Sequence, residues 1–93
     1  MDDILQKIIE TTSKYNVDKV VLFGSRARGD NSLHSDYDIA IYGKYFSALD
    51  KARLCSEVEE IETLKKIDIV FVDPNVADGL LESIKKDGVT IYG

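Results

Sequence analysis

The sequence predicts an α/β fold in which a mixed β-sheet of about four strands is covered by helices. Two observations lead to this prediction. Four short segments rich in valine and isoleucine alternate or run together as strands do. Three longer segments before and between them carry apolar residues at helical spacing. Because no repeat, low-complexity tract or linker interrupts the chain, residues 1–93 are expected to form a single domain.

The first half of the chain is expected to form one helix and then two strands. Residues 3–14 carry a helical stripe of isoleucine and leucine that begins at Ile4. The segment 17–24, VDKVVLFG, is β-branched and apolar and closes on glycine, which is typical of a strand. The segment 36–43, DYDIAIYG, alternates strictly. Its two aspartates should therefore share one face, and the opposite face should carry Tyr37, Ile39 and Ile41.

The second half is expected to add two helices and two strands. A helix over about 47–65 begins at Ser47, which with Asp50 three residues later resembles a capping box. Its apolar stripe consists of Leu54, Val58, Ile61 and Leu64. The segment 66–73, KIDIVFVD, reads as a strand that stops before the only proline, Pro74. A last helix with the stripe Val76, Leu80, Leu81 and Ile84 ends at a DG pair, and VTIYG follows as the last strand.

Composition excludes several classes of function. The net charge of −5 disfavours a long nucleic-acid partner, because basic residues supply most non-specific affinity for phosphate backbones. No apolar stretch approaches the roughly 20 residues of a membrane span, and the acidic start MDDILQK does not resemble a signal peptide. One cysteine and one histidine provide neither an internal disulfide nor a zinc cage. A cytoplasmic chain is therefore expected.

Three aspartates lie in segments that otherwise read as apolar strands. Asp36 and Asp38 should project from one face, roughly 6–7 Å apart along the strand. Asp68 lies between two isoleucines of a later strand, and pairing of the two strands would bring it beside them. Aspartate is rare in strand interiors, and three converging carboxylates suit a two-metal site for phosphoryl transfer. The alternative is that these aspartates only keep a strand soluble.

The turn GSRARG precedes the first aspartate pair. Gly24 would let the backbone approach a ligand closely, and Ser25 offers a hydroxyl to phosphate. Arg26 and Arg28 could add charge-assisted contacts to the same anion. The alternative is a polar turn with solvated arginines. The turn indicates an anion site more strongly once it is read together with the aspartates ten residues later.

These residues resemble a known family. Gly-Ser, a spacer of ten residues and Asp-x-Asp before an aliphatic residue resemble the signature of DNA polymerase β-type nucleotidyltransferases. The fuller form GSRARG…SDYDI, with a third aspartate and the closing DGVTIYG, resembles the minimal nucleotidyltransferases, or MNT proteins. The resemblance implies the nucleotidyltransferase fold and catalytic, metal-binding roles for Asp36, Asp38 and Asp68. It also implies nucleotide binding by Gly24, Ser25, Arg26 and Arg28.

The resemblance further implies an activity and a partner. Such proteins transfer a nucleoside monophosphate, here expected to be AMP from ATP, to a hydroxyl with the help of two Mg²⁺ ions. Many MNT proteins act as antitoxins of a HEPN-domain toxin, some by adenylylating a tyrosine on it. No acceptor-binding domain follows the third aspartate, so the acceptor is expected on another molecule or on a second copy of the chain.

Two other functions stay open at this stage. One is a non-catalytic antitoxin that masks its partner and keeps the aspartates as remnants. The other is a nucleotidyltransferase for a small molecule. His34 lies beside the first aspartate, but the carboxylates already supply the chemistry, so we interpret it as a loop residue.

Overall fold

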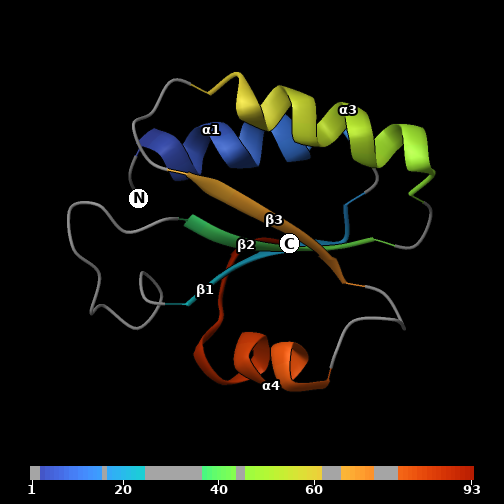
Figure 1. Ribbon diagram of the computed structural model, residues 1–93. Helices are drawn as coiled ribbons and strands as arrows, with labels where there is room; N and C mark the ends of the chain where they lie inside the picture. The colour runs from blue at the N-terminus through green and yellow to red at the C-terminus, as the bar shows by residue number, and fades with distance from the viewer. Residues whose placement is uncertain (1–2, 16, 25–36, 44–45, 62–65, 73–77) are drawn as a thin grey trace.

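The computed structural model describes residues 3–15, 17–24, 37–43, 46–61, 66–72 and 78–93. The expected order of helices and strands is confirmed within these ranges (Figure 1). The elements are α1 (Asp3–Thr12), β1 (Lys19–Phe23), β2 (Tyr37–Tyr42), α3 (Ala48–Glu59), β3 (Ile67–Val72), α4 (Asp78–Asp87) and β4 (Val89–Tyr92).

The four strands form one mixed sheet in the order β3-β2-β1-β4. β1 pairs antiparallel with both β2 and β4, whereas β2 pairs parallel with β3. Helix α3 connects the two parallel strands, because the chain must return to the end of the sheet at which β2 began before β3 can start. Figure 1 shows α1 and α3 on one face of the sheet and α4 on the other. The predicted α/β fold class is therefore confirmed.

The alternation in β2 decides which side chains enter which core. Tyr37, Ile39 and Ile41 are buried on the face that α1 and α3 cover, as predicted. The larger core on this face consists of Leu5, Ile8, Val20, Leu22, Tyr37, Ile39, Ile41, Leu54 and Val58. The smaller core on the α4 face consists of Val21, Phe23, Ala40 and Ile84.

Helix α3 begins as the sequence predicts but ends earlier. The Ser47 hydroxyl accepts a hydrogen bond from the backbone N–H of Asp50 at 3.1 Å, and the Asp50 carboxylate accepts from the N–H of Ser47 at 3.4 Å, so the capping box is present. The helix ends at Glu59, although its stripe predicts a helix to 65. Its last turn carries acidic and no basic residues, which the negative end of the helix dipole disfavours. Residues 62–65 lie outside the described ranges.

Helix α4 is anchored mainly at its C-terminal end. Ile84 is 2% exposed, and its carbonyl accepts a hydrogen bond from the N–H of Gly88 at 2.8 Å. Leu80 belongs to the same predicted stripe but is 36% exposed. The helix therefore covers only part of its face of the sheet. In the described part of the chain, no helix is long and apolar enough to cross a membrane.

Candidate active site

Two of the three predicted carboxylates lie side by side at one end of the sheet. β2 and β3 are parallel, so both strands begin at this end. Their register pairs Asp38 with Asp68 directly, and the N–H of Tyr37 donates to the Lys66 carbonyl at 2.9 Å. Neighbouring strands lie about 4.8 Å apart, which brings the two side chains into the same small volume. The predicted meeting of Asp38 and Asp68 is confirmed.

Strand alternation also decides which face these carboxylates occupy. Asp38 lies two residues before Ala40 and is in register with Phe23. Ala40 and Phe23 both belong to the core under α4. Asp68 precedes Val70 by two residues, and Val70 packs against the same core. Both carboxylates therefore share the α4 face and remain partly exposed, accessible to a ligand.

Gly24 completes this end of the site. It follows β1 directly and has φ of +76°, in the left-handed region that favours glycine. A Cβ built on Gly24 would overlap the Oδ2 atom of Asp38, so a larger residue would push this carboxylate aside. The glycine thus allows the backbone at the end of β1 to approach the carboxylate of β2.

A lysine that the sequence analysis did not single out also lies at this site. The Nζ atom of Lys66 is 3.4 Å from Oδ1 of Asp68, and the two side chains are 73% and 41% exposed. The signal that could have found it is its spacing, because residues two apart on a strand project from one face.

The remaining predicted site residues lie outside the described ranges. These are Ser25, Arg26, Arg28 and Asp36, and the loop residue His34 lies there too. The structure thus brings together Gly24, Asp38 and Asp68, and the functional roles of all seven predicted site residues stay predictions.

The described residues fit a hard divalent cation. Two adjacent carboxylates repel each other, and a cation such as Mg²⁺ offsets this repulsion while preferring oxygen ligands. Within the described ranges, no cluster of three or more histidine, cysteine or acidic residues is present, so the described carboxylate set is the pair Asp38 and Asp68. Mg²⁺ usually binds proteins through one or two carboxylates and takes its other ligands from water and phosphate. The pair suits such a site.

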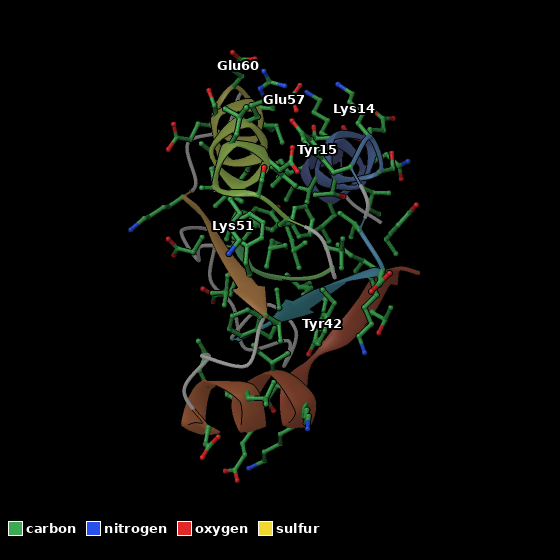
Figure 2. All side chains as sticks on the ribbon, turned by 90° about the vertical axis from the view of Figure 1, so that its right-hand side faces the viewer. Lys14, Tyr15, Tyr42, Lys51, Glu57 and Glu60 are labelled. Carbon is green, nitrogen blue, oxygen red and sulfur yellow. The ribbon has the colours of Figure 1, made fainter. Side chains whose placement is uncertain are left out.

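The opposite face of the sheet has a separate polar group. Figure 2 shows Lys14 and Tyr15 close to Glu57 above the sheet, with α4 on the far side. The Tyr15 hydroxyl donates to Oε2 of Glu57 at 2.5 Å, and Nζ of Lys14 is 3.8 Å from Oε1 of the same carboxylate. The hydrogen bond to Glu57 and, to a lesser extent, partial burial raise the pKa of Tyr15 above its usual value. An open pocket of about 450 Å³ lies beside this group, between α1 and the end of α3. We place the candidate active site at the carboxylate pair, because two carboxylates lie in register there and one of them, Asp38, lies against the Gly24 turn.

The carboxylate pair beside a glycine turn, on a mixed sheet of this order, is the arrangement expected of a nucleotidyltransferase. Residues 6–93 match the family model described as "Polymerase beta, Nucleotidyltransferase". The chain belongs to this family, as its motifs predicted.

Relatives and solved structures agree with this assignment. Two proteins of Methanocaldococcus jannaschii, each named "Putative protein adenylyltransferase", are 37% and 33% identical to this chain over 85 and 88 residues. The first alignment covers 87% of this chain and 90% of the relative, and the second covers 95% and 87%. A "putative nucleotidyltransferase" structure from Sulfolobus solfataricus is 29% identical with a TM-score of 0.59, over 92% of this chain and 73% of the other.

Two toxin–antitoxin structures share the fold at lower identity. One is a toxin–antitoxin crystal structure with AMP-PNP, which matches with a TM-score of 0.77 at 21% identity, over 96% of this chain and 73% of the other. The second holds a tri-AMPylated Shewanella oneidensis HEPN toxin with an MNT antitoxin. It matches with a TM-score of 0.72 at 18% identity, over 97% of this chain and 70% of the other. At these identities the likeness shows the fold.

Proposed function

We propose that this protein is a Mg²⁺-dependent adenylyltransferase that transfers AMP from ATP to a hydroxyl of a partner protein. The single observation that carries the proposal is the direct register of Asp38 with Asp68, on one face and beside Gly24. The names of the Methanocaldococcus jannaschii relatives support a protein as the acceptor.

Each predicted site residue has a role in this proposal. Gly24 and Ser25 hold the triphosphate, and Arg26 and Arg28 add positive charge to it. Asp36, Asp38 and Asp68 hold two Mg²⁺ ions. When bound, these ions neutralise charge on the phosphates and align the reacting oxygens. Asp68 orients the acceptor hydroxyl for in-line attack on the α-phosphorus and takes up its proton as pyrophosphate leaves.

We infer that the acceptor is a tyrosine on a HEPN-type toxin and that this chain, as a single domain of residues 1–93, acts as its antitoxin. Support comes from the Shewanella oneidensis complex, in which an MNT antitoxin is bound to a tri-AMPylated HEPN toxin. AMP on such a tyrosine would add bulk and negative charge to the toxin.

The direct test incubates the purified protein with Mg²⁺, ATP and the product of its neighbouring gene. Intact-mass spectrometry then follows the partner. An AMP-sized mass gain is expected, and it should disappear with Asp38→Asn. Asp18→Asn is the matched control, because Asp18 is an exposed aspartate before β1, at the other end of the sheet.

The other outcomes separate the alternatives. No mass gain together with a stable complex would favour an antitoxin that masks its partner. Neither a mass gain nor a complex would favour a small-molecule acceptor. An equal mass gain with wild type and Asp38→Asn would contradict the carboxylate mechanism.

A further inference from the structure

The backbone of Lys66 is fixed by a hydrogen bond, whereas its side chain extends into solvent. Its carbonyl accepts the 2.9 Å hydrogen bond from the N–H of Tyr37, which ties its main chain to the start of β2. Its side chain is 73% exposed, yet the ammonium lies 3.4 Å from Oδ1 of Asp68. An exposed, four-carbon stem can move the charge away at little cost, because the lysine side chain samples many rotamers in water.

In the metal-free protein, the Lys66 ammonium offsets part of the repulsion between two neighbouring carboxylates. Asp68 is in register with Asp38 on the neighbouring strand, so two negative charges are held close by backbone pairing. Like charges at this spacing destabilise the arrangement, and a cation beside one of them offsets part of that cost. A divalent cation would do the same with twice the charge, at the same carboxylate.

We propose that Lys66 is the counter-ion of Asp68 in the metal-free protein and competes with the divalent cation for this carboxylate. Lys66 is thereby a positioning residue: it holds the Asp68 side chain and limits how tightly the site binds metal before nucleotide arrives. The inference rests on the proposed function in one respect, namely that Asp68 is a metal ligand.

The chain contains a matched ion pair on the opposite face. Lys14 and Glu57 are 65% and 38% exposed, close to the values for Lys66 and Asp68, with 3.8 Å between Nζ and Oε1. Glu57 also accepts the Tyr15 hydroxyl and lies on α3, away from the carboxylate pair. Lys14→Met therefore removes the same charge and the same kind of pair without touching the candidate metal site.

The experiment measures binding of Mn²⁺ alone, without nucleotide, by electron paramagnetic resonance of the free ion. Wild type is compared with Lys66→Met, Lys66→Arg and Lys14→Met. Lys66→Met should bind Mn²⁺ about two- to fivefold more tightly, the range expected from losing one exposed competing charge. Lys66→Arg and Lys14→Met should bind it as wild type does. Thermal unfolding provides a second readout, in which Mg²⁺ should raise the Tm of Lys66→Met more than that of the other proteins.

Unchanged or weaker Mn²⁺ binding by Lys66→Met would overturn the inference. An equal gain in Lys14→Met would overturn it too, because net charge would then explain the effect, and so would a lack of Mn²⁺ binding by all four proteins. Tighter Mn²⁺ binding by Lys66→Met, without any AMP transfer by wild type, would contradict only the proposed function. AMP transfer with Mn²⁺ affinity unaffected by Lys66 would sink only the inference.

Discussion

The two faces of the sheet differ in how completely they are covered. α1 and α3 cover one face, where Ile8, Ile39, Ile41 and Leu54 are fully buried. α4 alone covers the other face, anchored by Ile84, and leaves Asp38 and Asp68 partly exposed at the start of β2 and β3. One face therefore provides most of the stability, and the other provides the candidate site.

The difference is created within three consecutive residues. Tyr37 is 1% exposed and Ile39 is fully buried, while Asp38 between them points to the α4 face. Because side chains alternate along a strand, a carboxylate can be held rigidly by buried neighbours without being buried itself. Substitution of Asp38 should therefore lower mainly the transfer activity, whereas substitution of Ile39 should lower mainly the stability.

The largest expected effect is loss of transfer in Asp38→Asn. Asparagine keeps the shape of aspartate but removes the negative charge that a divalent cation requires, so the rate should fall on the order of 10²–10³-fold or more. In urea unfolding, Asp38→Asn should lose less stability than Ile39→Ala does. Initial rates of AMP transfer, measured by mass spectrometry, test this prediction. A rate near that of wild type would contradict the assignment of the active site to the α4 face.

Ile39→Ala should show the reverse pattern. Ile39 is fully buried in the core, and truncating such a side chain to alanine costs about 2–5 kcal/mol of unfolding free energy. The conservative Ile39→Val should cost only about 0.5–1.5 kcal/mol. Transfer per folded molecule should stay within about twofold of wild type, since the backbone of β2 is still paired on both sides. A large loss of transfer without a loss of stability would contradict the comparison.

The parts of this arrangement that local sequence determines could be predicted. Strict alternation from Tyr37 to Tyr42 determines the two faces, and the Ser47–Asp50 spacing determines the start of α3. The meeting of Asp38 and Asp68 could be predicted only as a consequence of pairing between their strands. Their direct register depends on a parallel crossover through α3, which is a tertiary feature.

Other features depend on forces that a residue pattern does not display. Helix α3 ends at Glu59 although its apolar stripe continues to Leu64, and the helix dipole does not explain this end, because the last turn carries no basic residue. The exposure of Leu80 reflects where α4 docks. A role for Lys66 could not be predicted, because a lysine before a strand is common and only the folded structure shows its ion pair with Asp68.

Gly24→Ala should affect both stability and transfer. Alanine disfavours φ of +76°, and its Cβ would displace the Asp38 carboxylate, so about 1–3 kcal/mol of unfolding free energy and most of the activity should be lost. Gly79→Ala in α4 is the control, because a Cβ there meets nothing within 4 Å and alanine favours the helix. Chemical unfolding and transfer assays of both variants test this. Equal behaviour of the two variants would show that the approach of Gly24 to Asp38 is unimportant.

The smallest expected effect concerns Tyr15 on the covered face, and it appears as a dependence of stability on pH. The hydrogen bond to Glu57 raises the pKa of Tyr15 above its ordinary value of 10.0, so the folded protein holds this proton more tightly than the unfolded chain. The resulting stabilisation is complete below about pH 10 and is lost as pH rises through the folded-state pKa. Tyr15→Phe lacks this contribution, while the other tyrosines titrate in both proteins. The difference in unfolding free energy between wild type and Tyr15→Phe should therefore be constant between about pH 8 and 9.5 and shrink above about pH 10. A difference that stays constant into the alkaline range would mean that the hydrogen bond to Glu57 does not hold the phenol proton in the folded protein.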